Sequence, residues 1–308
     1  MGSAPWWVAN GLNSASRWCV PVFLMISGAL ALDPAKVARL RAFYRRRWHR
    51  VGVPLVFWTV VYLAFRALVL GQDLTPDQAA SDVARGSPFL QLYFLYVLAG
   101  LVVIMPFLKV ITRHATWRMS LGLAVVLLAL GVADQVVSYL GGVGEPNAAT
   151  RFLPFAGYYV LGWCLRDVLL AGRWVLWVWV AMGASVGLTA FGAVVSDWGA
   201  LGRYTYGFLS PTVAVMSVAA YLLLHHVLRR RGRGLERLAP LAFGVFLVHG
   251  ALVYGFRRLI GVPDDVVGVV ASAVGLTLVY ALVSAGITWV LLRVPYLRAV
   301  LGEPARPG

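Results

Sequence analysis

Four arginines close together are the clearest candidates for chemistry in this chain. Arg45, Arg46 and Arg47 are consecutive, and Arg50 follows three residues later. Planar guanidinium groups bind phosphate oxygens in pairs, so such a run can hold a polyphosphate ligand. The same run can serve only as an anchor, because basic residues gather on the cytoplasmic side of membrane segments. Consecutive side chains on a helix point in different directions, so we expect one or two of these arginines to contact a ligand.

His249 lies inside a long apolar run. It is eleven residues beyond the start of the apolar segment 238–256, which at 1.5 Å per residue is about 16 Å, near the middle of a bilayer. An ionisable side chain at that depth faces the interior of a helix bundle or a water-filled cavity. Two interpretations stay open: a neutral histidine that is hydrogen-bonded between helices, and a residue of a functional site.

Three further polar residues lie in or beside apolar runs. Asp134 is close to the end of the segment 119–139, and Arg151 comes just before the next segment, on the same predicted side of the membrane. Pairing between these two charges would line a cavity, and solvation at the interface is the alternative. Tyr158 lies seven residues after Arg151. It fits packing or an interface belt more readily than catalysis, and we retain all three as possible acceptor or cavity residues.

The two cysteines give no sign of a metal site. Cys19 and Cys164 both lie within apolar runs, far apart in the sequence. Neither belongs to a Cys or His spacing that is typical of metal ligands. A free cysteine in an apolar setting packs as a small hydrophobic residue. We therefore predict two buried structural thiols and no bound metal.

The amino-acid composition indicates the kind of secondary structure in which these residues lie. The chain has 308 residues, of which 60% are hydrophobic and 13% are charged, with a mean hydropathy of +0.79. Soluble domains are about 25% charged, so a soluble globule, a disordered chain and a coiled coil are all excluded. Long apolar runs satisfy their backbone in lipid as helices or closed barrels, and these runs lack the alternation of barrel strands. The sequence predicts an all-α polytopic membrane protein.

Nine apolar segments are long enough to cross a bilayer or nearly so, since a crossing needs about 20 residues. The segments are 14–32, 51–70, 89–108, 119–139, 152–165, 174–195, 205–226, 238–256 and 266–292. The longest connections between them are 33–50 and 71–88. No internal repeat or separate soluble domain is visible, so we predict a single membrane domain over residues 1–308.

The net charge of +15 reflects an uneven distribution of basic residues. Loops on the side of 33–50 hold 20 of the 27 Lys and Arg residues, and loops on the other side hold six, Arg17 among them; Arg66 lies within a span. The positive-inside rule then places 33–50, Val227–Arg237 and the C-terminus in the cytoplasm and the N-terminus outside. Short basic loops without a groove-reading motif argue against binding of nucleic acid.

Five segments together resemble the acyltransferase-3 family of integral membrane acyltransferases. In chain order they are 20–28 (VPVFLMISG), the basic run 44–47 leading to Pro54, Trp58 and Tyr62, 92–96 (LYFLY) continuing to 106–108, 155–162 (FAGYYVLG) and 242–249 (AFGVFLVH). The resemblance extends over roughly residues 6–295. It is nearest to the branch that O-acetylates surface polysaccharides and related sugars.

The resemblance implies transfer of an acyl group, acetyl in particular, from acyl-CoA to a hydroxyl group of a glycan or glycolipid. It implies a multi-pass protein of the inner or plasma membrane, with acyl-CoA as a substrate and no permanently bound cofactor. Arg45, Arg46, Arg47 and Arg50 would bind the donor, and a histidine would act as general base.

One departure from the family concerns that base. In the family, the first helix carries an arginine and a downstream histidine. Residues 1–13 would correspond to the loop that leaves this helix. We therefore expect a further helix upstream of Met1, giving ten in the complete protein. The catalytic residue is then unknown within this chain, and His249 is a candidate substitute.

Two other functions stay open at this point. A transporter or flippase of a small molecule or lipid would use Asp134 and His249 along a proton or substrate path, although the sequence lacks the internal repeat that is common in transporters. A truncated, non-catalytic relative of the acyltransferases is the other. The sequence does not indicate the acceptor, the acyl chain length or the oligomeric state.

Overall fold

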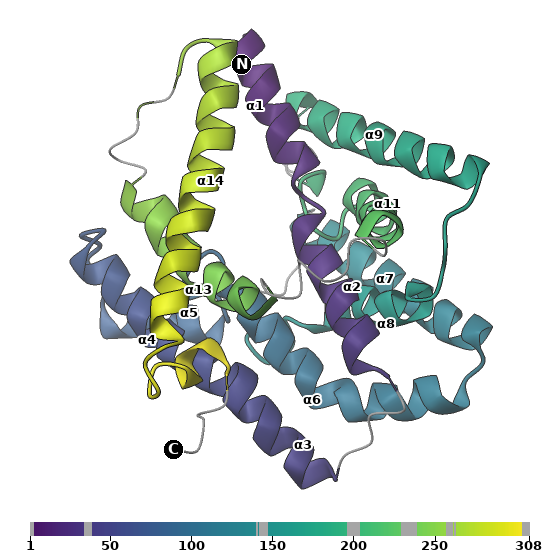
Figure 1. Ribbon diagram of the computed structural model, residues 1–308, viewed down its shortest axis with the longest axis horizontal. Coiled ribbons are helices and arrows are strands. Elements are labelled where there is room, and N and C mark those ends of the chain that lie inside the picture. The colour runs from purple at the N-terminus through teal and green to yellow at the C-terminus, as the bar shows by residue number, and fades with distance from the viewer. Residues whose placement is uncertain are drawn as a thin grey trace. The chain divides into compact units, whose positions relative to one another are not determined.

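The computed structural model describes residues 3–33, 39–139, 141, 147–195, 204–228, 239–256, 261 and 263–303. Within these ranges every regular element is a helix, and no strand occurs (Figure 1). The prediction of an all-α fold is confirmed.

The helices follow one another along the chain with short connections. The α-helices are α1 (Ala4–Ala15), α2 (Cys19–Ala31), α3 (Leu40–Arg47), α4 (Val53–Leu68), α5 (Pro76–Ala84), α6 (Tyr93–His114), α7 (Trp117–Tyr139), α8 (Ala156–Leu165), α9 (Arg173–Val194), α11 (Pro211–Leu228), α13 (Ala239–Phe256) and α14 (Val266–Leu291). A π-helix, η1 (Trp48–Gly52), joins α3 to α4. Two short 3-10 helices are η2 (Leu153–Phe155) and η4 (Ala299–Leu301).

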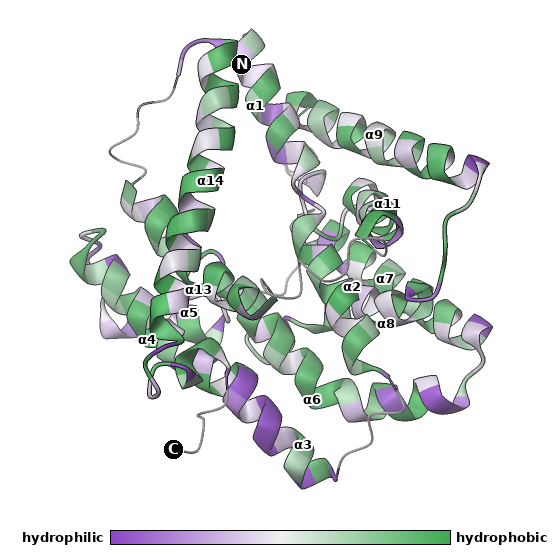
Figure 2. Ribbon diagram, viewed as in Figure 1, coloured by the Kyte–Doolittle hydropathy of each residue, from purple (hydrophilic) through white to green (hydrophobic). Residues whose placement is uncertain are grey.

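Nine apolar helical segments match the nine predicted spans. Among the described residues, eight are long and apolar enough to cross a membrane, and Leu153–Leu165 is a shorter one. Their apolar side chains face outward, as Leu278 and Leu282 of α14 do with more than half of their surface exposed. Figure 2 shows apolar residues over most helices and polar residues concentrated on α3. This distribution is that of a multi-pass membrane protein, because lipid rather than water covers such a surface.

The first predicted span began ten residues too late. Helix α1 starts at Ala4 and is capped by the Ser3 side chain, which accepts from the Trp6 backbone N–H at 3.4 Å. Helices α1 and α2 lie end to end in Figure 1 and together form one apolar segment, Ala4–Ala31. Residues 4–13 are therefore helical rather than part of a loop. The polar residues among them lower the local hydropathy, and for that reason the predicted span did not include this segment.

Both long connections also contain helices. The basic run expected in the loop 33–50 lies on α3 and η1, which continue into α4 to give one helical segment, Leu40–Leu68. The connection 71–88 contains α5, which begins with a capping box between Thr75 and Gln78. Arg66 lies in the last turn of α4. Its guanidinium pairs with Asp82 of α5 at 2.6 Å. A charge at the end of a predicted span is therefore paired with a carboxylate of a connecting helix.

The described chain divides into two compact units. Unit 1 comprises Met1–Val37, Val103–Gly144 and Phe152–Gly232, and unit 2 comprises Ala38–Val102, Glu145–Arg151 and Arg233–Gly308. Helix α6 contributes its first half to unit 2 and its second half to unit 1. A single domain over residues 1–308 stays a prediction.

Unit 1 is held together by close approaches at glycine. A Cβ on Gly28 of α2 would collide with the backbone carbonyl of Tyr159 in α8, and one on Gly162 of α8 would collide with the carbonyl of Met25 in α2. Small residues allow helix backbones to approach in this way inside membranes. The reciprocal pair explains why α2 and α8 share so extensive an interface.

Unit 2 has an aromatic core. Tyr62 stacks on Phe89 with ring centroids 4.5 Å apart, and Trp58 donates its indole N–H to the carbonyl of Val300 at 2.9 Å. The core residues are Trp58, Tyr62, Phe89, Leu92, Leu95, Leu247, Val248, Val300 and Leu301. The bond to Val300 ties the C-terminal segment to α4, next to the arginine run.

Candidate functional site

The arginine run lies on one helical segment, with its side chains spread around the helix. Arg45, Arg46 and Arg50 are exposed and Arg47 is half-buried. The Arg47 guanidinium lies 5.6 Å from the centre of the Phe43 ring. The three consecutive arginines therefore point different ways, as expected for helical residues. Among the described residues, no carboxylate pairs with Arg45, Arg46 or Arg50.

The turn that carries Arg50 is wider than an α-helical turn. Residues Trp48–Gly52 form a π-helix in which the Val53 N–H bonds to the Trp48 carbonyl. Single π-turns inside α-helices are frequent at functional sites. A Cβ at Gly52 would meet the Trp48 ring where it now lies, so this glycine leaves room for the ring. No pattern in the sequence indicates this turn, since π-turns have no distinct hydrophobic period.

The C-terminal segment packs against the same turn. Gly302 has a positive φ of 75°, and a Cβ added to it would meet the backbone carbonyl of Arg50 at 2.6 Å. Arg298, one turn earlier, is partly buried, and its Nε lacks a hydrogen-bond partner within the described part of the chain. A cationic residue that the sequence analysis did not single out therefore belongs to the segment that supports the arginine run.

His249 is oriented by one hydrogen bond. Its Nδ1 lies 3.1 Å from the carbonyl oxygen of Val245. Because a carbonyl can only accept, Nδ1 is the donor in this bond, and in the neutral form of such a ring Nε2 is the acceptor. The side chain is half-buried beside Phe246, whose ring centroid is 6.0 Å away. A histidine held in this way can accept a proton at Nε2, which is the function of a general base.

The Tyr62 hydroxyl bonds to the backbone of α13 next to His249. Its hydroxyl donates to the Leu247 carbonyl at 2.6 Å and accepts from the Ala251 N–H at 3.1 Å. These two backbone groups are ordinarily each other's partners in an α-helix. The Gln91 side chain lies against Gly250 from another direction, and its Nε2 is buried without a partner among the described residues. A polar side chain of α4 and one from the turn before α6 thus lie against the turn that bears His249.

The other three candidates fall in different units. Asp134 belongs to unit 1 and is exposed, and Arg151 belongs to unit 2. The Arg151 Nε donates to the carbonyl of Arg85 at 2.9 Å. Burial lowers the pKa of the Arg151 guanidinium, an effect that Tyr93 opposes. The pairing of Asp134 with Arg151 stays a prediction.

Tyr158 is fully buried, and its hydroxyl donates to the Phe208 carbonyl at 2.7 Å. That bond supports packing within unit 1.

The arginine run and His249 both belong to unit 2. Among the described residues, no three His, Cys, Asp or Glu side chains gather as metal ligands.

Arg17 is a polar residue whose position the sequence analysis misjudged. It is thirteen residues from Ala4 and fourteen from Ala31, or about 20 Å from each end at 1.5 Å per residue. It therefore lies near the middle of this apolar segment, whereas the sequence prediction had counted it with the outer loops. Its Nη2 donates to the Asn13 side chain at 2.9 Å, and the guanidinium lies 5.0 Å from the centre of the Tyr206 ring.

The polar side chains of α1 find partners in distant parts of unit 1. Asn10 donates to the Ala190 carbonyl of α9 at 2.9 Å and accepts from the Tyr206 hydroxyl. The break between α1 and α2 follows from Pro21, which has no N–H to offer the carbonyl of Arg17 four residues earlier. Turn-type bonds between residues three apart replace it, such as Cys19 N–H to the Ser16 carbonyl at 3.2 Å.

Comparison with known proteins gives one finding for the chain as a whole. The model of the acyltransferase-3 family, described as an acyltransferase domain, matches residues 2–293. The matched range includes α1, the arginine run and His249, and so extends over segments of both units. No curated protein and no solved structure matches the chain.

Proposed function

Since the chain belongs to the acyltransferase-3 family, we propose that this membrane acyltransferase moves an acetyl group from acyl-CoA to a hydroxyl group of a glycan or glycolipid. The family match over nearly the whole chain is the observation that carries the proposal. The acceptor class follows the resemblance to the branch that O-acetylates surface polysaccharides. The donor class follows the basic run, because acyl-CoA carries a pyrophosphate and a ribose phosphate.

The donor would bind at α3 and η1. Arg45, Arg46 and Arg50 are exposed there without a carboxylate partner among the described residues. Unpaired guanidinium groups are available for bidentate bonds to phosphate oxygens. Arg47 would contribute less to phosphate binding than Arg46, because the Phe43 ring lies against its guanidinium. The run still acts as a membrane anchor, since one arginine can interact with both a ligand and the interface.

His249 is the candidate base within the described residues. Its Nε2 would take the proton of the acceptor hydroxyl while the hydroxyl oxygen attacks the thioester carbonyl carbon. The carbon–sulfur bond then breaks, a new ester bond forms, and the CoA thiolate leaves and takes up the proton. The thiolate is a good leaving group, so this step requires less electrophilic help than attack on an ester. Tyr62 would fix the backbone of α13 around the histidine.

We place the protein in the inner or plasma membrane, with the arginine run and the C-terminus in the cytoplasm. Acyl-CoA is made in the cytoplasm, so the excess of basic residues on that side puts the donor site where the donor is. The glycan acceptor would approach from the opposite side of the bundle. The bundle would thus bring together two substrates that the membrane keeps apart.

A transfer assay tests the proposal. Membranes that contain the full-length protein are supplied with acetyl-CoA labelled in the acetyl group, and membranes lacking the protein serve as the control. We expect release of free CoA thiol together with label in glycans or glycolipids that mild alkali removes, as it removes esters but not amides. Alkali-stable label would contradict the hydroxyl acceptor. Absence of thiol release with acetyl-CoA and with longer acyl-CoA donors would contradict the donor class.

A further inference from the structure

We propose that a groove between α2 and α11 binds an anionic phospholipid, with one acyl chain along its apolar walls and the phosphate against Arg166. The groove belongs entirely to unit 1. The arginine run and His249 belong to unit 2. The inference concerns a ligand other than the two substrates of the proposed reaction.

The walls of the groove match a hydrocarbon chain. Val22, Ile26 and Leu30 of α2 form one wall, and Leu224 and Leu228 of α11 form the other. The wall residues are spaced three or four apart along each helix, so each set forms a continuous stripe. The cavity has a volume of about 420 Å³, within the range of small-molecule sites. Ile26 is 44% exposed and Leu30 63% exposed, so the groove opens to the surface of the unit.

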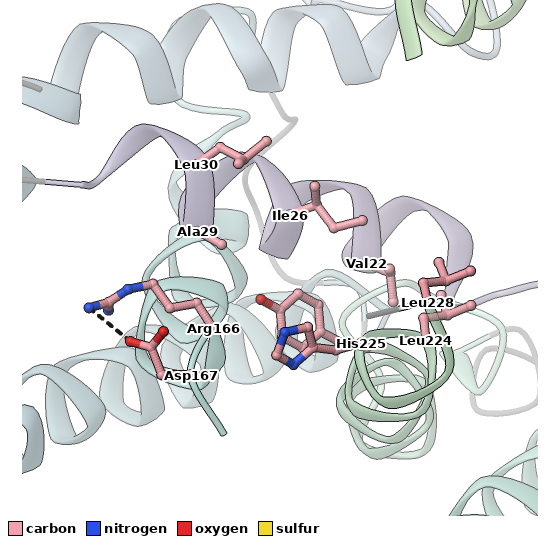
Figure 3. Close-up of a pocket in the computed structure, with 10 residues that line it drawn as sticks. Val22, Ile26, Ala29, Leu30, Arg166, Asp167, Leu224, His225 and Leu228 are labelled. Carbon is pink, nitrogen blue, oxygen red and sulfur yellow. Dashed lines mark ion pairs between the residues drawn. The ribbon is translucent and has the colours of Figure 1, made fainter. Parts of the chain in front are cut away.

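One part of the groove is polar. Arg166 and Asp167 follow α8 and contribute to the lining together with His225 of α11. Figure 3 shows Arg166 and Asp167 at the end of the groove where α2 carries Ala29. His225 is oriented by a 3.3 Å bond between its Nδ1 and the Val168 carbonyl.

Trp163 and Asp167 hold Arg166 in place, but they use only part of the hydrogen-bonding capacity of its guanidinium. Its guanidinium lies 3.2 Å from the centre of the Trp163 ring, and Nη1 donates to the Trp163 carbonyl at 2.8 Å. Nη2 pairs with the Asp167 carboxylate at 3.1 Å. A guanidinium has five N–H groups, so three remain to bind phosphate oxygens. Asp167 is 79% exposed. Its carboxylate would compete with a phosphate group for the Arg166 guanidinium.

The charge around this groove favours an anionic occupant over a neutral one. Basic pockets between membrane helices on the cytoplasmic side bind anionic lipid head groups. Arg166 lies on the predicted cytoplasmic side, and in the sequence three arginines follow Leu228 directly. A zwitterionic head group would bring a second cation towards Arg166 and lose part of this attraction. The groove walls alone would not distinguish the two kinds of lipid.

A second groove in unit 1 provides a matched comparison. It also has a volume of about 420 Å³, and its walls include Trp174, Trp177 and Ala181 of α9 and Leu222 of α11. No charged residue lines it within the described residues. An acyl chain can bind in either groove, so the preference for an anionic head group belongs to the first groove alone.

Native mass spectrometry of the full-length protein in detergent tests the inference. Phosphatidylglycerol and phosphatidylcholine with identical acyl chains are added in equal amounts, and the ratio of the two in the singly bound state is measured. We expect the parent to prefer phosphatidylglycerol. Arg166→Gln should reduce this ratio about five-fold, the factor that corresponds to about 1 kcal/mol per basic residue at an anionic surface. Arg173→Gln, which removes a basic residue outside the groove, should leave the ratio unchanged.

Three further variants allow the inference to be tested even if Arg166→Gln fails to fold. Asp167→Asn removes the competing carboxylate from an exposed position and should raise the ratio. Ala29→Phe fills the first groove and should reduce the ratio, whereas Ala181→Phe fills the second and should not. Equal binding of the two lipids by the parent, or an unchanged ratio in Asp167→Asn, would overturn the inference. Displacement of the bound phosphatidylglycerol by acyl-CoA would also overturn it, because the groove would then belong to the donor.

Discussion

His225 and His249 are both half-buried, and both present Nδ1 to a backbone carbonyl. His249 lies in a turn of α13 whose backbone also bonds to the Tyr62 hydroxyl, whereas His225 lines the groove beside α2. The two rings are held in the same way in different surroundings, and only His249 is proposed to accept a proton from a substrate.

Replacing Arg46 should weaken use of the donor more than use of the acceptor. A hydrogen bond to a charged group contributes about 1.5–3 kcal/mol, so Arg46→Ala should raise the KM for acetyl-CoA by about 10–100-fold. Arg46→Lys keeps the charge but not the bidentate geometry, and should recover only part of this loss. The KM values are measured by titrating acetyl-CoA at saturating acceptor, with insertion of each variant verified.

Arg113→Ala is the control, because Arg113 is exposed on the predicted cytoplasmic side and outside the run. It should leave the KM unchanged. If Arg46→Ala, Arg46→Lys and the parent share one KM for acetyl-CoA, the run is only an anchor.

Replacing His249 should reduce kcat. Loss of a general base costs about 10²–10⁴-fold in rate, so His249→Gln should lower kcat by that factor with little change in the KM for acetyl-CoA. His114→Gln, at the exposed end of α6, should retain full activity. Single-turnover release of CoA thiol is the measurement. A His249→Gln rate within a few-fold of the parent would assign the base to another residue.

At the scale of elements, the contact between α2 and α8 depends on two glycines. Gly28→Ala places a methyl group against the Tyr159 carbonyl, and backbone cannot move aside as a flexible side chain can. Overpacking of this kind costs about 1–3 kcal/mol, so the thermal midpoint in detergent should fall for Gly28→Ala and for Gly162→Ala. Gly183→Ala on α9, with nothing within 4 Å of the added Cβ, should leave it unchanged.

The two substitutions should also be non-additive. Once the first has separated the helices, the second methyl group meets more space, and contacting residues generally couple in this way. A double variant whose loss equals the sum of the two single losses would mean that the helices do not move apart as a pair.

At the scale of the whole molecule, the charge distribution sets the orientation. Reassigning Arg17 to the middle of a span leaves the asymmetry intact, because 20 basic residues still belong to one side. In a background with Cys19→Ala and Cys164→Ala, we expect Arg41→Cys to react with a membrane-impermeant thiol reagent only after the cells are opened. Asp77→Cys in α5 should react in intact cells. The reverse pattern would invert the proposed topology.

The sequence by itself determined the class of the protein, the number of apolar helices and the family resemblance. Hydropathy is an average over about 20 residues, and an apolar stretch of that length has few ways to satisfy its backbone in lipid other than as a helix. The ordered series of motifs around Val20–Gly28 and Ala242–His249 then indicated the acyltransferase family, which the match over residues 2–293 confirmed.

Only the tertiary structure decided how the polar residues are used. The span that contains Asn10 and Arg17 looked too polar to continue, but Asn10 is satisfied by Ala190 and Tyr206, which are about 180 and 196 residues away. The turn beside His249 bonds to a hydroxyl from α4. A local average cannot detect partners so distant in the sequence. Whether a polar group can be buried depends on the partners that folding brings to it, because each unsatisfied group in lipid costs several kcal/mol.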